Sequence, residues 1–164
     1  LALTSIDYAR LIQYTAQRKH MVLLNKTQIN KILFYVYGAY LADTGKALFS
    51  DDTPKAWTYG PVFPKPNKKV DTSEIIKSFP PEKVAEYKAD PKALNLIVEV
   101  VNSMYNKSAI SLTRWSHVEG SPWYDTIYEK DEKGDIKSQR PWNTRIENDL
   151  IKNYFSKSQN RIFG

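Results

Sequence analysis

A single stretch between Asn25 and Gly45 constrains the fold more than any other part of this sequence. Its apolar residues recur at the spacing of a helix that turns one face toward a core: Ile29, Ile32, Leu33, Val36 and Tyr40. Asn25 and Gln28 have the spacing of a capping box, and Gly45 can close a helix in the left-handed conformation. We therefore expect a helix over residues 26–44.

Five further segments combine an N-terminal cap residue with apolar residues at helical spacing. Ser, Thr and Asp side chains accept hydrogen bonds from the first free N–H groups of a helix, and proline fits its first turn. The expected helices begin at Thr4, Asp90-Pro91, Ser111, Ser121-Pro122 and Thr144, and the first ends near His20. In the segment after Asp90, the stripe expected to face the core is Leu94, Ile97, Val98, Val101 and Tyr105.

Residues 46–90 contain six of the nine prolines, so we expect regular structure to be interrupted there. Each proline removes a backbone donor and disfavours helix at the residue before it. Short turns or one-turn helices are expected, including a short helix that starts at Asp52-Thr53-Pro54 and carries Ala56 and Trp57. Residues 65–73 should form an exposed loop.

The length of 164 residues points to one domain, residues 1–164, which is long enough to bury a hydrophobic core without the help of disulfide bonds or structural metal ions. Hydrophobic residues make up 41% of the chain and charged residues 26%, which is the balance of a globular protein and not of a disordered one. Residues 130–143 are polar, so we expect a loop or a small hairpin there. The predicted fold class is mainly α: a single compact domain of five to seven helices, with room for a small β-hairpin.

The absence of cysteine and the presence of only two histidines, His20 and His117, exclude several kinds of site. Disulfides, thiolate zinc sites, cysteine nucleophiles and His-rich metal clusters all need residues that this chain lacks. We expect no metal and no cofactor. The longest apolar run, residues 32–42, is too short to span a membrane and no secretory signal is visible, so we expect a cytoplasmic protein with no membrane partner. Because residue 1 is Leu, we expect a few native N-terminal residues to be missing.

Catalytic patterns are few, and we expect no enzyme. The chain has no G-x-S-x-G elbow and no glycine-rich phosphate loop. One enzymatic hypothesis stays open, in which His20 and His117 act as an acid–base pair in RNA cleavage. In the favoured alternative, His20 merely ends a helix and His117 forms hydrogen bonds inside the fold.

The net charge is +6, and one segment concentrates lysines without acidic residues. Its lysines are Lys55, Lys65, Lys68 and Lys69, and no Asp or Glu lies between residues 53 and 70. Such a cluster can bind phosphate groups or an acidic protein surface. A solvated lysine-rich loop is the simpler interpretation and is favoured.

Three motifs occur in an order that carries a family resemblance. They are the helix Asn25–Leu41, the pair Leu48-Phe49 followed by Lys55-Ala56-Trp57-Thr58-Tyr59-Gly60-Pro61-Val62-Phe63-Pro64, and His117 shortly before Pro122-Trp123. In this order the chain resembles the Panacea domain family, which includes SocA-like antitoxins and phage-associated GepA-like proteins, over about residues 21–155. Lys65-Pro66-Asn67 departs from the family pattern, which often continues toward a tyrosine.

The resemblance implies a mainly helical, antitoxin-like protein that neutralises a co-encoded toxin by direct binding. The implied partner is the cognate toxin, and a protease is a second partner in those relatives that act as adaptors. A nucleic-acid-binding protein that uses the Lys55–Lys69 segment is the alternative, and its signature would be affinity that falls steeply with salt.

The residues expected to contact the partner come from the three motifs and the adjacent lysine. They are Lys31, Tyr35, Trp57, Tyr59, Gly60, Pro61, Lys65, His117 and Trp123. Structural roles compete with these contact roles. Lys31 is expected on the solvent side of its helix, Gly60-Pro61 can be a backbone device, and His117 can fix a helix junction. For Trp57, Tyr59 and Trp123 two alternatives stay open: they pack in the core or they line a surface groove.

Overall fold

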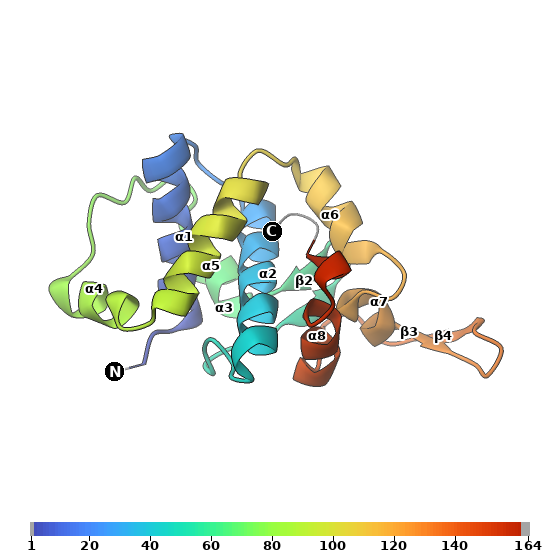
Figure 1. Cartoon of the computed structure of the whole chain (residues 1–164). Coiled ribbons are helices and arrows are strands. Elements are labelled where there is room, and N and C mark those ends of the chain that lie inside the picture. Colours follow the sequence, from blue (N-terminus) through green and yellow to red (C-terminus); the bar gives the residue numbers. More distant parts are fainter. Residues whose placement is uncertain (1, 162–164) are drawn as a thin grey trace.

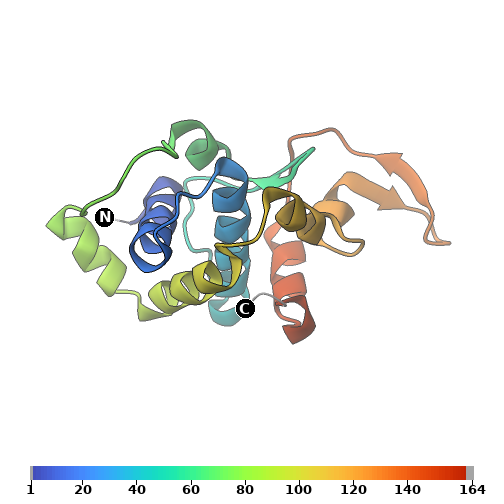
Figure 2. The same cartoon turned by 90° about the horizontal axis from the view of Figure 1, so that it is seen from above.

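Helix α2 (Lys26–Thr44) runs through the centre of the fold, and other helices pack around it (Figure 1, Figure 2). Its helical neighbours are α1 (Ser5–His20), α3 (Pro64–Lys69), α5 (Pro91–Met104), α6 (Ala109–His117) and α8 (Asn148–Phe155). The remaining helical elements are α4 (Pro81–Lys88), α7 (Pro122–Ile127) and the 3₁₀ turn η1 (Ser158–Asn160). The computed structural model describes residues 2–161 of the chain.

The predicted helix over residues 26–44 is confirmed at both ends. Asn25 Oδ1 accepts a hydrogen bond from the Gln28 N–H at 2.8 Å, and Gln28 Oε1 accepts one from the Asn25 N–H at 2.9 Å. Gly45 closes the helix with a φ of 74°. Burial is wider than the predicted stripe, because every residue from Ile29 to Ala39 is buried. Helix α2 is therefore a core element on all sides.

The predicted starts of three other helices are also confirmed, and one is shifted. Thr4 caps α1, Asp90 caps α5 and Ser121 caps α7. Helix α6 begins three residues earlier than predicted, because Ser108 and not Ser111 is its N-cap. The Ser108 hydroxyl accepts a hydrogen bond from the Ser111 N–H at 3.1 Å, which places Ser111 inside the first turn.

The buried side of α5 is rotated from the predicted stripe. Its buried residues are Ala93, Leu96, Ile97, Val100, Val101 and Met104. Leu94, Val98 and Tyr105 were expected in the core but are half-buried at the edge of this face. The rotation follows from packing, since α5 contacts α1 and α4 as well as α2.

The predicted short helix that carries Ala56 and Trp57 is wrong, because these residues belong to strand β1 (Lys55–Trp57). Strand β1 pairs antiparallel with β2 (Gly60–Val62) and with β5 (Thr144–Arg145), in the order β2-β1-β5. The register pairs Lys55 with Val62 and Arg145, Ala56 with Pro61 and Thr144, and Trp57 with Gly60. Strand β5 lies far away in the sequence, so no local pattern could indicate this pairing.

The same pairing delays the start of the last helix. The sequence predicts a helix from Thr144, but Thr144 lies in β5 and α8 begins only at Asn148, after Glu147 at the N-cap position.

A second correction concerns the loop expected over residues 65–73. Its first half is helix α3, because Pro64 takes a first-turn position that a helix tolerates.

Of the loop and the small hairpin expected for residues 130–143, the structure has the hairpin, which begins two residues earlier, at Tyr128. Strands β3 (Tyr128–Lys130) and β4 (Ile136–Gln139) pair antiparallel and project from the helical body (Figure 1). Residues 2–161 form eight α-helices, six of which have at least seven residues, so the mainly helical fold class is confirmed. In this part of the chain, every helix is too short or too polar to cross a bilayer.

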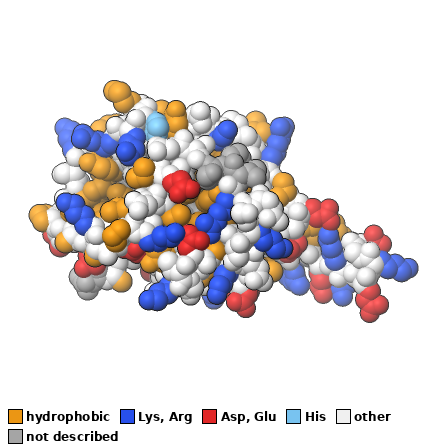
Figure 3. Space-filling view, in the orientation of Figure 1, with side chains coloured by type: hydrophobic (Ala, Val, Ile, Leu, Met, Phe, Trp, Pro, Cys, Tyr) orange, Lys and Arg blue, Asp and Glu red, His pale blue; other side chains and the backbone are white. Residues whose placement is uncertain are grey.

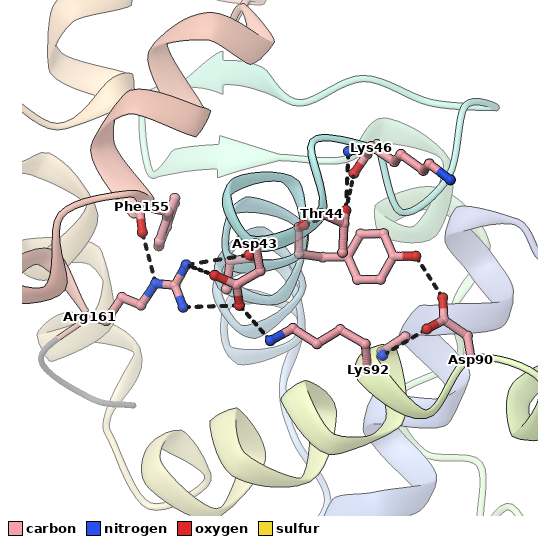
Figure 4. Close-up of polar contacts among 10 residues, drawn as sticks. Asp43, Thr44, Lys46, Asp90, Lys92, Phe155 and Arg161 are labelled. Atoms are coloured by element: carbon pink, nitrogen blue, oxygen red, sulfur yellow. Dashed lines mark hydrogen bonds and ion pairs between the residues drawn. The ribbon is translucent and has the colours of Figure 1, made fainter.

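Asp43, in the last turn of α2, joins the C-terminal part of the described chain to α5 (Figure 4). Arg161 donates two hydrogen bonds to the Asp43 carboxylate, at 2.7 and 3.2 Å, and its Nε donates to the Phe155 carbonyl at 2.8 Å. Lys92 Nζ lies 2.8 Å from the same carboxylate. The hydrogen bonds from Arg161 are the main cause that lowers the pKa of Asp43.

We expect Asp43→Asn to reduce the free energy of unfolding by about 1 kcal/mol near neutral pH, because both cations lose their counter-ion. A carboxyl group with a lowered pKa in the folded state stabilises the fold above its unfolded pKa, and this contribution disappears as the pH falls through the folded pKa. The difference between parent and variant should therefore shrink below about pH 4.

Urea unfolding at neutral pH and at about pH 3 measures this difference. Asp135→Asn is the matched control, since Asp135 lies exposed in the β3–β4 loop and should leave stability unchanged. A loss of stability that is the same at both pH values would contradict the ion-pair explanation.

Candidate functional site

The turn between β1 and β2, residues 57–61, is where the structure brings most of the predicted contact residues together. Helices α2, α6 and α7 each send one side chain to a backbone carbonyl of this turn. The three hydrogen bonds are Trp123 Nε1 to Trp57 O at 2.7 Å, His117 Nε2 to Thr58 O at 2.9 Å, and Lys31 Nζ to Pro61 O at 3.3 Å. We name this arrangement the clamped turn, since three helices fix its position relative to the core.

His117 links α6 to the clamped turn through both of its ring nitrogens. Nδ1 lies 2.7 Å from the Thr113 carbonyl oxygen, and Nε2 lies 2.9 Å from that of Thr58. The ring also lies against Trp123, with centroids 3.7 Å apart. Carbonyl oxygens only accept hydrogen bonds, so a neutral ring donates to one of them and a doubly protonated ring to both. These contacts match the helix-junction role.

His20 lies in different surroundings. It stacks on Tyr105 with a centroid distance of 3.6 Å, and its Nε2 lies 2.7 Å from Asn102 Oδ1. Within residues 2–161, no hydrogen bond or ring contact joins His20 to His117. The structure thus does not bring together the pair that the RNA-cleavage hypothesis requires.

Lys31 is buried, so its predicted position on the solvent side of the helix is wrong. Its side chain is only 1% exposed, because α2 is covered on every side. Burial lowers the pKa of Lys31 to about 8, since a charged ammonium group is poorly solvated in the core. The ammonium group donates to the Pro61 carbonyl, which ties the centre of α2 to strand β2.

Gly60 provides the space that this arrangement needs. Its φ of 112° lies in a region that L side chains rarely adopt. A Cβ atom at this position would lie 2.6 Å from Ser116 Oγ and 2.9 Å from Lys31 Cε. The predicted role of Gly60-Pro61 as a backbone device therefore agrees with the geometry.

The remaining predicted residues separate into core and surface. Tyr35 is buried and stacks on Trp115, with centroids 5.4 Å apart. Lys65 is exposed on α3, outside the clamped turn, and its backbone N–H donates to the Asp52 carboxylate at 2.8 Å. Trp123 is buried beneath the turn that it holds.

A shallow, mainly apolar groove of about 430 Å³ lies beside the clamped turn, and its side chains include three aromatic rings. It is lined by Trp57, Thr58, Tyr59, Trp142 and Asn143, and we name it the aromatic groove. Tyr59 is 72% exposed and Trp142 is 42% exposed. No charged side chain lines the groove, so a ligand there would meet rings and backbone.

Thr58, Trp142 and Asn143 line the groove but are absent from the predicted contact residues. Asn143 Oδ1 accepts a hydrogen bond from Trp57 Nε1 at 2.9 Å, and the Trp142 ring stacks near Trp123 with centroids 6.2 Å apart. Asn143 has a positive φ of 77°, which a short amide side chain tolerates. A tryptophan within an otherwise polar segment was the signal that could have indicated Trp142.

Groups of His, Asp and Glu side chains that could hold a metal ion are not found among the described residues.

Comparison with known proteins gives one match: a family profile described as antitoxin SocA-like, Panacea domain, matches residues 29–124. This range includes most of α2, the clamped turn, His117 and Trp123, and ends before Trp142. No curated protein and no solved structure matches the chain.

We expect Lys31→Met to stabilise the protein near neutral pH. The difference between a pKa of about 8 in the fold and the ordinary value of 10.5 corresponds to about 3 kcal/mol of unfavourable charge burial. Loss of the hydrogen bond to Pro61 offsets about 1 kcal/mol, so the expected net gain is about 2 kcal/mol.

The gain should be full below about pH 8 and should decrease as the pH rises toward 10.5, where the unfolded lysine also loses its proton. Urea unfolding of parent and variant at pH values on both sides of 8 measures it. Lys26→Met, at an exposed position of the same helix, should show no such gain. A Lys31→Met protein that is less stable than the parent below pH 8 would contradict this account of Lys31.

Proposed function

The chain belongs to the antitoxin SocA-like, Panacea domain family, and from this premise we propose that it neutralises a co-encoded toxin by direct protein–protein binding, without catalysis. The observation that carries the proposal is the aromatic groove on the clamped turn. Partly exposed Tyr and Trp side chains on a fixed backbone are typical anchors of protein interfaces.

Rigidity supports this use of the turn. The carbonyl groups of Trp57, Thr58 and Pro61 each accept a hydrogen bond from a different helix. A segment that is already held in one position loses little conformational entropy when a partner binds to it. The clamped turn can therefore present Tyr59 at low entropic cost.

The predicted contact residues then divide into two groups. Trp57 and Tyr59 contact the toxin, together with Trp142, which the sequence analysis did not include. The other residues hold these contacts in place: the buried Lys31, Gly60, Pro61 and Trp123 and the half-buried His117 fix the turn, and Tyr35 packs in the core behind it. Lys65 lies outside the groove and is not needed for the proposed contact.

Charge argues for recognition by shape and apolar contact. The chain carries a net charge of +6, and the residues that line the groove are uncharged. A basic inhibitor cannot imitate the phosphates of a nucleic acid substrate. If the toxin acts on RNA, the antitoxin would cover its active surface with rings instead of competing by charge.

A second candidate function, nucleic-acid binding, rests on helix α3. Lys65, Lys68 and Lys69 are exposed there, and Lys55 is half-buried on β1. None of the four forms an ion pair with a described residue. Binding by these lysines would weaken steeply with salt, whereas binding through the aromatic groove would not.

We expect Tyr59→Ala and Trp142→Ala each to weaken the complex with the product of the adjacent gene by at least about tenfold, because exposed anchors of this type dominate interface energies. The melting temperature of Tyr59→Ala should match that of the parent, since its ring is mostly exposed. Affinity by titration calorimetry and growth rescue on co-expression provide the two measurements.

Ile75→Ala is the matched control, since Ile75 is a similarly exposed apolar residue outside the groove. It should bind and rescue growth as the parent does. The proposal fails for this pair if the parent neither binds the adjacent gene product nor rescues growth. The proposal fails for this surface if the parent binds and both groove variants bind as tightly as the parent. A DNA or RNA shift at low salt that disappears on replacing Lys65, Lys68 and Lys69 would favour the second function.

A further inference from the structure

The loop between α1 and α2 presents a second and chemically different surface at one end of the helical body (Figure 1). Met21 is 91% exposed and Leu23 is 51% exposed, although both are large and apolar. We name residues 18–26 the α1–α2 tip. It shares no residue with the aromatic groove.

The backbone of the tip is held in place, so these apolar side chains stand on an ordered support. Met21 has a φ of 56°, in the left-handed region, and its N–H donates to the Gln17 carbonyl at 3.0 Å. On one side His20 stacks on Tyr105. On the other side Leu24 is buried. Glycine is the usual residue in the left-handed position after a helix, because this backbone conformation is unfavourable for other residues. In this chain the position is taken by a methionine, and its apolar side chain is exposed.

The charged side chains near these two apolar residues along the chain are all positive. Arg18, Lys19 and Lys26 are exposed, and none forms an ion pair with a described residue. No Asp or Glu occurs between residues 8 and 42. Figure 3 shows Lys and Arg side chains beside hydrophobic ones along the upper edge of the molecule.

Charge complementarity selects the kind of partner. A second copy of this chain would place positive tips against each other, and like charges repel. A nucleic acid would pair with the cations but leave Met21 and Leu23 in water. An anionic phospholipid surface takes both groups, because its headgroups attract Lys and Arg while its interior accepts apolar side chains.

We propose that the α1–α2 tip binds peripherally to anionic phospholipid bilayers. Met21 and Leu23 enter the boundary between headgroups and acyl chains, and Arg18, Lys19 and Lys26 contact the phosphate groups. The contact goes beyond toxin binding and leaves the aromatic groove free. It would place the antitoxin at a membrane surface without a spanning helix.

Co-sedimentation with vesicles tests the proposal. Vesicles of pure phosphatidylcholine are compared with vesicles of equal parts phosphatidylcholine and phosphatidylglycerol, at low and at high salt. The parent should bind the anionic vesicles at low salt only. Met21→Gln/Leu23→Gln and Lys19→Gln/Lys26→Gln should each reduce the bound fraction by at least about fivefold, because both the apolar and the electrostatic contributions are needed.

Ile136→Gln is the matched control, since Ile136 is 52% exposed on β4 and should bind as the parent does. Thermal unfolding of each variant shows whether it is folded, and the exposed tip positions should leave it unchanged. Three outcomes overturn the proposal: no binding of the parent to anionic vesicles, full binding by Met21→Gln/Leu23→Gln, or tip variants that change only a nucleic-acid shift. Growth rescue by the tip variants should equal that of the parent, so failure here is distinct from failure of toxin binding.

Discussion

Burial of α2 on every side is the constraint on which the rest of the structure depends. All residues from Ile29 to Ala39 lie in the core, so helices before and after it in the sequence must cover its whole surface. Gly38 shows how close this packing is, because a Cβ there would lie 2.1 Å from the Phe155 ring. Helix α8 can approach only where the side chain is a hydrogen, and this approach brings Phe155 against Phe34 and Tyr35.

The same burial explains why a charged residue supports the candidate site. Lys31 is enclosed with the rest of the helix, and a buried ammonium group needs an acceptor. The Pro61 carbonyl provides one, which draws strand β2 onto α2, and Gly60 leaves room for the contact. The clamped turn is thus held by buried residues on its core side, while Tyr59 on the same turn is exposed to solvent. If Lys31→Met raises stability as predicted, the lysine at this position fits a functional requirement for a fixed turn.

The two exposed surfaces differ in the kind of recognition that they allow. The aromatic groove is uncharged and stands on a backbone held by three helices, which suits a partner of matching shape. On the α1–α2 tip, two exposed apolar side chains lie among positively charged ones. Such a surface suits an anionic layer that has no defined shape.

The sequence by itself determined the features that depend on neighbours in the chain. The caps at Thr4, Asn25 and Ser121 involve residues within one turn, so a local pattern contains all the information needed. Tertiary structure alone decided that residues 55–57 form a strand, that Lys31 is buried, and that Trp142 joins the groove. The physical reason is that strand pairing and burial are set by segments distant in sequence, and their packing overrides local preferences.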